Sequence, residues 1–448
     1  MKPYKIILLF IMIVVARQSW AQQSRKMSLQ QAVDFAMNHN YGLLSSEKDV
    51  EAAKQQVKER MAYGFPQVNA SVGYKDNIAR PTSLLPGEFV GQPGKDVEIQ
   101  FGTRYNANVN GSITQLIFSG EYLIGLKAAK TFFEKTNVDF FKNKVALKKQ
   151  VAQSYFDVLA TREALRIVDS TLQTTQKLYT ETKQIFKAGL VEDTDVDQLE
   201  LLVENLKASQ TNFINRLGIT EAFLKFYLGM ESTDTIILTD NLRQLIDQKK
   251  QSILLQKQFH YRNNPDYASL FKQKEISALQ VDLAKSAYWP SINANLNAGT
   301  NAQRDSWNFF DTNEKWFFSS FWGVTMNIPI LSGGQRRAKV KQAKIAFDQV
   351  NLIEKQLVTQ LELQYKAAKN DYINTLLVLK NKEKNRLVAE KIYKKTQEKY
   401  INGMARSLDI LNTHTQYLTA ENQYINASVG FLKAAESLQA ILTEMQNR

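Results

Sequence analysis

The two halves of this chain repeat the same order of sequence features. An aromatic residue precedes a glycine by three positions in Phe186-Lys-Ala-Gly189, and again 214 residues later in Tyr400-Ile-Asn-Gly403. Self-similarity at a fixed offset indicates a duplicated structural unit. We therefore expect two structural repeats after an N-terminal leader, one over residues 22–248 and one over residues 249–448.

Each repeat contains a very long stretch with no proline, Gly120–Gly189 in the first and Gly333–Gly403 in the second. The chain has 19 glycines and 8 prolines in 448 residues, whereas average usage would give about 31 and 22. As a helix, each stretch would be roughly 100 Å long at about 1.5 Å per residue. Apolar residues recur every seven positions before the first turn: Val151, Val158, Leu165, Leu172, Tyr179 and Phe186.

The same seven-residue repeat continues in the second half, with one exception at Arg386. A sustained heptad pattern on both sides of a glycine turn favours an antiparallel coiled-coil hairpin. The sequence thus predicts a mainly α fold with a small β part, in which two helical hairpins have their tips at residues 189 and 403. An ordinary helical bundle is the alternative.

Each repeat also carries two segments in which apolar and uncharged polar residues alternate. These four predicted strands lie at about 67–78, 104–117, 291–301 and 317–329. Asparagine and serine dominate one face, and the pattern is typical of outer-membrane barrel strands, apolar toward lipid and polar toward a wet lumen. The residues expected to face lipid are Val68, Val72, Val109, Ile113, Ile292, Leu296, Trp322 and Val324. A small soluble sheet with one solvated face is the alternative.

The N-terminus has the features of a secretory signal. Lys2 and Lys5 precede the apolar run Ile6–Ala16, and Ser19-Trp20-Ala21 has the pattern of a cleavage site. We therefore predict a signal peptide over residues 1–21 and an exported protein. Its removal would lower the formal net charge from +13 to +10, because Lys2, Lys5 and Arg17 are lost.

Several kinds of chemistry are excluded by composition. The chain has no cysteine, and its three histidines, His39, His260 and His414, lie far apart in the sequence. No glycine-rich phosphate loop, nucleophile motif or metal-spaced histidine set is present. We expect neither an enzyme nor a cofactor or metal site, and export argues against nucleic acid as a partner.

Four strands are too few to close a barrel, since the smallest transmembrane barrels have eight, and an open sheet edge in hydrocarbon leaves backbone groups unpaired. If these strands lie in lipid, several copies of the chain have to associate. Two copies would supply eight strands and three would supply twelve.

The order of these features resembles the TolC-type outer-membrane efflux protein family. The similarity includes Pro329-Ile-Leu-Ser-Gly-Gly-Gln-Arg336 and Arg262-Asn-Asn-Pro-Asp266, together with the doubled strand pairs and turns. It implies a homotrimer in the outer membrane, with a twelve-stranded barrel joined to an α-helical tube that extends into the periplasm. It also implies a passive exit channel that docks to a periplasmic membrane-fusion adaptor and an inner-membrane RND or ABC-type pump. The alternative function is a periplasmic coiled-coil adaptor or structural protein without a pore.

Within that resemblance, the two helical turns form the periplasmic entrance of the channel. Gly189 and Gly403 are suited to tight turns because glycine tolerates a positive φ. Leu190 and Met404 follow them and are expected to contact the adaptor.

Asp195 and Asp409 are equivalent at the 214-residue offset. The resemblance implies that Asp409, repeated by symmetry, forms an acidic ring at the entrance, and that Tyr400 donates a hydrogen bond to Asp195. Where the family carries a second aspartate this chain has Asn412, and Arg406 lies one position beyond the family's arginine. The alternative role of both aspartates is to stabilise the N-termini of their helices.

One basic cluster is unusual for its position. Arg336, Arg337, Lys339 and Lys341 fall at the predicted start of the second long helix, where the helix dipole disfavours cations. We expect them to lie just below the membrane and to face anionic groups.

Overall fold

The computed structural model describes residues 25–91, 93–250 and 253–445, and the predicted signal peptide, residues 1–21, lies outside them. Most of the described residues are helical, as predicted. The helices are α2 (Leu29–His39), α3 (Tyr41–Ala62), α4 (Gly120–Lys187), α5 (Asp193–Leu228), α6 (Leu242–Lys250), α7 (Pro265–Ser286), α8 (Gln335–Ile401) and α9 (Ser407–Ile441). The strands are β1 (Arg25–Met27), β2 (Gln67–Asp76), β3 (Thr82–Leu85), β4 (Val97–Gln100), β5 (Tyr105–Ser119), β6 (Ile236–Leu238), β7 (Ser291–Arg304) and β8 (Phe317–Asn327).

The chain forms two compact units. The first, which we call the hairpin unit, consists of Met1–Val50, Asn137–Leu270 and Glu354–Arg448. The second, the sheet unit, consists of Glu51–Thr136 and Phe271–Ile353. Both predicted repeats contribute residues to each unit. The two helical turns belong to the hairpin unit, and the four predicted strands belong to the sheet unit.

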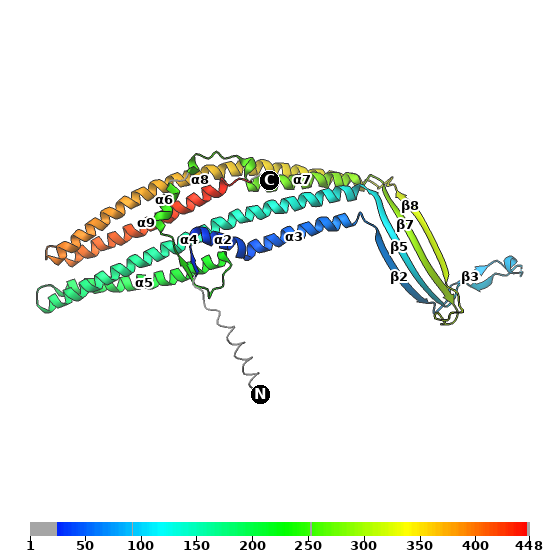
Figure 1. The fold of residues 1–448 in the computed structure, drawn as a ribbon, viewed down its shortest axis with the longest axis horizontal. Coiled ribbons are helices and arrows are strands. Elements are labelled where there is room, and N and C mark those ends of the chain that lie inside the picture. The colour runs from blue at the N-terminus through cyan, green and yellow to red at the C-terminus, as the bar shows by residue number, and fades with distance from the viewer. Residues whose placement is uncertain (1–24, 92, 251–252, 446–448) are drawn as a thin grey trace, which may run out of the picture. The chain divides into compact units, whose positions relative to one another are not determined.

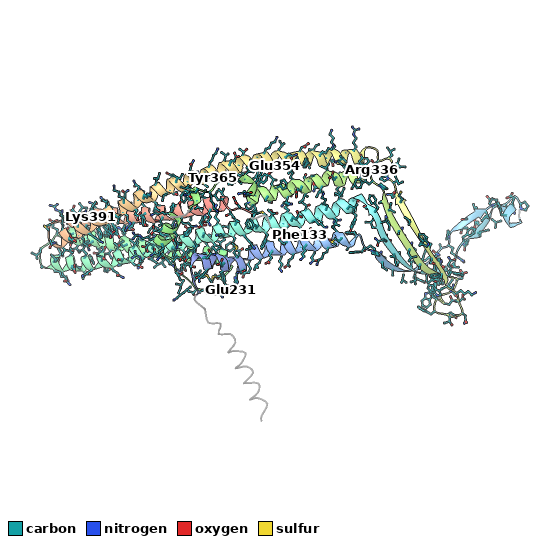
Figure 2. The ribbon with its side chains drawn as sticks, turned by 45° about the horizontal axis from the view of Figure 1, so that its top comes forward. Phe133, Glu231, Arg336, Glu354, Tyr365 and Lys391 are labelled. Atoms are coloured by element: carbon teal, nitrogen blue, oxygen red, sulfur yellow. The ribbon has the colours of Figure 1, made fainter. Side chains whose placement is uncertain are left out.

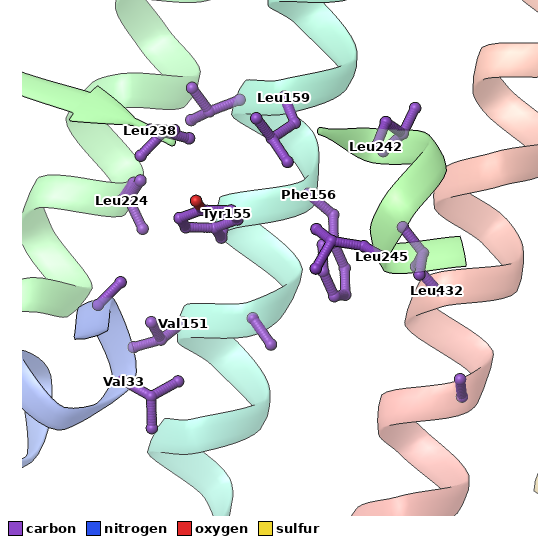
Figure 3. Packing of buried hydrophobic residues seen from close by; sticks show 14 of the residues in the cluster. Val33, Val151, Tyr155, Phe156, Leu159, Leu224, Leu238, Leu242, Leu245 and Leu432 are labelled. Carbon is purple, nitrogen blue, oxygen red and sulfur yellow. The ribbon is translucent and has the colours of Figure 1, made fainter. Parts of the chain in front are cut away.

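The hairpin unit is built around buried side chains of α4. Val151, Tyr155 and Phe156 are fully buried there and pack in one cluster with Leu224 of α5 and Leu432 of α9 (Figure 3). Burial of this apolar surface provides the main favourable free energy for packing these helices together.

A short parallel ribbon closes one side of this core. Strands β1 and β6 pair from Arg25↔Ile236 to Met27↔Leu238. The Tyr155 hydroxyl lies 3.0 Å from the backbone oxygen of Met27. The ribbon therefore joins the beginning of the described chain to the segment after α5, and no pattern in the sequence predicts it.

The first helical stretch of the chain divides into two helices, α2 and α3, on either side of Asn40. The Asn40 side chain accepts a hydrogen bond from the Leu43 backbone N–H at 2.9 Å and donates one to the Tyr227 backbone oxygen at 2.9 Å. Asparagine competes in this way with continuous helix hydrogen bonding. Gly229 approaches the same break closely, since a Cβ on it would clash with the His39 backbone oxygen.

The sheet unit contains one four-stranded antiparallel sheet in the order β2-β5-β7-β8, and these strands lie side by side in Figure 1. Each strand lies where the alternating pattern predicted it, within a few residues at the ends. A second ribbon, β3 with β4, occupies the turn-rich segment 79–104, where no strand was predicted. Within the described residues, β2 pairs only with β5 and β8 pairs only with β7, so the sheet has two unpaired edges.

Candidate functional site

The two helical turns have the same backbone geometry. Gly189 has φ 74° and Gly403 has φ 72°. The N–H of each glycine donates to the carbonyl three residues earlier, at 2.8 Å from Gly189 and at 2.9 Å from Gly403. A Cβ on either glycine would meet no atom within 4 Å. Glycine is therefore suited to both positions by its backbone conformation and not by a lack of space.

Both turns expose an apolar side chain directly after the glycine. Leu190 is 77% exposed and Met404 is 70% exposed. An exposed apolar residue is ordinary when it stands alone. Here two of them occupy equivalent positions beside matching turns.

A buried hydrogen bond joins the two hairpins near these turns. Ser407, the first residue of α9, is 1% exposed, and its Oγ donates to the carboxylate of Asp195 in α5. The same Oγ lies 2.7 Å from the side-chain amide of Gln198. Because a hydroxyl has one hydrogen, we assign that hydrogen to the carboxylate and orient the Gln198 amide to donate in return.

Tyr400 has a different partner from the one expected. Its hydroxyl pairs with Oγ1 of Thr182 at 2.9 Å, and not with Asp195. The expected bond between Tyr400 and Asp195 is therefore wrong: the tyrosine hydroxyl bonds Thr182 and the aspartate accepts from Ser407. Burial raises the pKa of Tyr400, and the nearby charge of Asp195 adds to this effect, so the phenol stays neutral.

Asp409 stabilises the start of its own helix. Its carboxylate accepts a hydrogen bond from the backbone N–H of Arg406 at 3.0 Å. This matches the alternative role expected for Asp409. The side chains of Asp409, Arg406 and Asn412 are nevertheless exposed, so they remain accessible at this end of the hairpin unit.

The one exception to the heptad pattern is an ion-pair site. Arg386 Nη1 lies 3.2 Å from the carboxylate of Glu421 on α9 and 3.3 Å from that of Glu390, one turn along α8. Its guanidinium also covers the ring of Tyr424 at 5.2 Å. An arginine can therefore occupy a position between helices because the partner helix supplies a carboxylate and an aromatic face.

A second buried polar residue lies farther along α9. His414 is fully buried, its ring centroid is 5.3 Å from that of Tyr393, and neither ring nitrogen has a hydrogen-bond partner. Burial lowers the pKa of His414 to about 4, so the imidazole is neutral near pH 7. His414 is therefore a packing residue between helices α8 and α9.

Ser407, Gln198 and Thr182 were not identified from the sequence. A signal for Thr182 was present, because it lies seven residues after Thr175 and both threonines are almost completely buried. Seven-residue spacing places two side chains on the same face of a coiled-coil helix. No comparable signal marks Ser407 or Gln198.

The sheet separates its side chains as the alternation predicted. Val68, Ile113, Leu296 and Trp322 are directly opposite one another across the four strands. Directly opposite residues share a face of the sheet, so these four form one apolar row. All four are exposed, from 38% for Ile113 to 78% for Trp322. The remaining residues predicted to face lipid are Val72, Val109, Ile292 and Val324, and of these Val72, Val109 and Val324 are also exposed.

The next row along the strands is polar on three of its four positions. Asn69, Ser112 and Asn297 lie opposite one another, and Phe321 completes the row on β8. A sheet that is polar on one face and apolar and exposed on the other fits a boundary between water and lipid.

In the part of the chain that the structure describes, no group of histidine or acidic residues is placed to hold a metal ion. No described helix combines the length and the apolar character that a membrane span requires.

Comparison with known proteins places this architecture in a family. The outer membrane efflux protein family model matches residues 32–230 and 261–444, one segment in each predicted repeat. The outer membrane protein TolC of Vibrio cholerae is 21% identical over 431 residues, covering 95% of this chain and 91% of that protein. The probable efflux pump outer membrane protein TtgC of Pseudomonas putida is 21% identical over 357 residues, covering 79% of this chain and 69% of that protein.

Solved structures show the same fold. The outer membrane channel CmeC of Campylobacter jejuni aligns with a TM-score of 0.71 at 15% identity, over 95% of this chain and 90% of that one. The outer membrane protein VceC of Vibrio cholerae aligns with a TM-score of 0.69 at 14% identity, over 93% of this chain and 96% of that one. The chain therefore belongs to the outer membrane efflux protein family, whose members are outer-membrane channels and not enzymes.

Proposed function

We propose that this chain forms the outer-membrane exit channel of a tripartite efflux or secretion system. Three copies would build a twelve-stranded barrel and a helical tube, and the channel would be a passive polar conduit energised by an inner-membrane RND or ABC-type pump. The observation that carries the proposal is the four-stranded sheet, which has two unpaired edges and an exposed apolar row.

The unpaired edges argue for association of several copies. In hydrocarbon no water is available to pair with the free backbone groups of β2 and β8, and each unpaired group costs several kcal/mol. Pairing β2 of one copy with β8 of the next satisfies both edges. The same-face apolar row would then continue around the outside of the barrel, with the asparagine and serine face lining the lumen.

The hairpin unit supplies the entrance in this proposal. Leu190 and Met404 would contact a periplasmic membrane-fusion adaptor, because both are exposed and apolar at the two turns. Asp409 and Asn412 of each copy would narrow the opening, since both side chains are accessible there. The bond between Ser407 and Asp195 would hold the two hairpins together in the closed state.

The association can be tested by thiol crosslinking, because the natural chain has no cysteine. Ser71 on β2 and Ser319 on β8 face the same side of the sheet. Because strands that close a barrel are staggered, Ser71→Cys is paired in turn with a cysteine at each position on that face of β8, namely Ser319, Phe321, Gly323, Thr325 and Asn327. At the register where β2 of one copy meets β8 of the next, the double variant, treated in outer membranes with a short bifunctional maleimide, is expected to give covalent dimers and trimers and no larger species.

The single variants Ser71→Cys and Ser319→Cys are the matched controls and should not give the trimer, because like edges do not meet in a closed ring. Monomers alone from every double variant of the series would contradict the proposal. A ladder that extends beyond three copies would contradict the closed trimer.

A further inference from the structure

The segment that joins β8 to α8 exposes apolar side chains at one end of the sheet. Ile330 is 91% exposed and Leu331 is 88% exposed, and both lie between the end of β8 and the start of α8. Neighbouring aromatic residues lie at the same ends of the strands. Tyr288 and Trp289, directly before β7, are each about half exposed. Aromatic residues are enriched where a membrane surface meets water.

A basic segment follows at once. The first three turns of α8 carry Arg336, Arg337, Lys339, Lys341 and Lys344, and all but Arg336 are exposed. The sequence from Trp316 to Phe347 contains no aspartate or glutamate. Arg336 is labelled in Figure 2 at this end of α8.

Nothing in the described chain neutralises these five cations. Arg336 Nη1 donates to the backbone oxygen of Pro329 at 2.9 Å, and its guanidinium lies over the ring of Tyr288 at 5.6 Å. Among the described residues, none of the five forms an ion pair with a carboxylate.

The local helix also disfavours this arrangement. Cations at a helix N-terminus oppose the dipole, and like charges at spacings of three and four residues, as at Arg337 and Lys341, repel one another. The equivalent helix of the first repeat, α4, has Glu121 in its first turn, as the dipole favours. The first turn of α8 has no acid. The described chain therefore supplies no acid to offset the positive charge at the start of α8.

We propose that Ile330, Leu331 and these five cations form a lipid-binding collar for anionic phospholipid headgroups of the periplasm-facing leaflet. The inference rests on the outer-membrane position of the sheet. Its strands run directly into the segment that carries Ile330 and Leu331, so the apolar pair lies at the edge of the hydrocarbon. The cations follow within about 15 Å of that edge, at the helical rise of about 1.5 Å per residue. They would therefore lie at the depth of the lipid headgroups.

The test uses a fluorophore beside the collar. Gln335→Cys is exposed, and it would be the chain's one thiol for labelling. The labelled channel is reconstituted in vesicles that contain a small fraction of nitroxide-labelled phosphatidylglycerol or, separately, the same fraction of nitroxide-labelled phosphatidylcholine. We expect stronger quenching by the anionic lipid, with an enrichment of roughly fivefold for each charge that reaches the headgroups.

The variant Arg337→Gln/Lys339→Gln/Lys341→Gln/Lys344→Gln should lose this preference. A matched control on the same helix removes four exposed lysines at the opposite end, in Lys384→Gln/Lys391→Gln/Lys395→Gln/Lys399→Gln, and should keep it. If the first variant does not assemble, high salt provides the second measurement, because it should abolish the preference of the unsubstituted collar by screening.

Each outcome separates the collar from the channel. Equal quenching by both lipids in the unsubstituted collar would overturn the lipid preference and leave the membrane position intact. No quenching by either lipid would overturn the membrane position itself. Loss of the preference in the control variant as well would overturn the assignment to these particular cations.

Discussion

Ser407 donates its hydroxyl hydrogen to the carboxylate of Asp195, a residue 212 positions earlier in the chain. Ser407 begins α9 and Asp195 lies in the first turn of α5, so one hydrogen bond joins the two hairpins beside their turns. Ser407 is almost completely buried, so its hydroxyl has almost no contact with water. A bond of this kind can hold two helical hairpins together and can also be broken locally.

Replacing this serine is expected to weaken the closed state of the entrance. A hydrogen bond to a charged group contributes about 1.5–3 kcal/mol, so Ser407→Ala should raise the open-to-closed ratio roughly tenfold or more. The measurement is single-channel conductance in planar bilayers. Adding Ser407→Ala to an Asp195→Ala background should have a much smaller effect, because the bond is already lost.

Thr415→Ala is the control for this experiment, since Thr415 is exposed on the same helix and its hydroxyl donates to the backbone oxygen of Leu411, one turn earlier in that helix. Conductance in Ser407→Ala equal to that of the unsubstituted channel would show that the bond does not restrain the entrance.

The contact between Tyr400 and Thr182 is expected to stabilise the same region through a neutral hydrogen bond. Tyr400→Phe leaves the almost completely buried Thr182 hydroxyl without this partner and should lower stability by about 1–3 kcal/mol. The double variant Tyr400→Phe/Thr182→Val removes both polar groups with little change of shape and should recover most of that loss. Thermal unfolding followed by helical circular dichroism measures both. A double variant less stable than the single one would contradict this account.

His414 should make the hairpin unit sensitive to acid. The pKa of His414 is about 4 in the folded protein, below the ordinary value of 6.5. Above pH 6.5 the ring is therefore neutral in the folded and in the unfolded chain, and it causes no loss of stability. As the pH falls from 6.5 to 4, the unfolded chain binds a proton that the folded chain excludes. The free energy of unfolding then falls by up to about 3 kcal/mol, because the two pKa values differ by about 2.5 units and each unit corresponds to about 1.36 kcal/mol.

His414→Phe keeps an aromatic ring beside Tyr393 and should remove most of this acid sensitivity. The measurement is the melting temperature at pH 7.5 and at pH 4.5. His39→Gln is the control, because His39 is exposed on α2. An unchanged difference between the two melting temperatures in His414→Phe would assign the acid sensitivity to other groups.

Leu190 and Met404 are expected to act in docking and not in conduction. Leu190→Ser/Met404→Ser should abolish efflux in cells, measured by a susceptibility panel, while leaving single-channel conductance unchanged. Leu84→Ser, which removes a similarly exposed leucine from β3, should leave efflux intact. Efflux at the unsubstituted level in the double variant would exclude both side chains from the adaptor contact.

The parts of the fold that depend on local sequence could be predicted. Alternation over about ten residues was enough to find the four long strands, because side chains of a strand point to opposite faces in turn. The turns at Gly189 and Gly403 were found because few residue types other than glycine adopt a positive φ. The short ribbons, β1 with β6 and β3 with β4, were missed because three or four residues give no measurable alternation.

The details of the entrance depend on how the two hairpins pack. Tyr400 and Asp195 were expected to bond, but the relative register of α5, α8 and α9 places Ser407 on the aspartate and Thr182 on the tyrosine. A heptad pattern identifies which face of a helix is buried and does not fix that register. Arg386 illustrates the same limit, because its partner Glu421 lies on a different helix.

The two unpaired edges of the sheet bear on how the protein is made. A newly exported copy carries a row of free backbone groups on β2 and another on β8, so a solitary copy would enter the bilayer at a large energetic cost. In the proposed trimer, insertion and association would be one cooperative event, and the yield of finished channels should rise more steeply than in proportion to the rate of synthesis. Until that event, both edges of an unassembled copy would stay free to pair with strands of other chains.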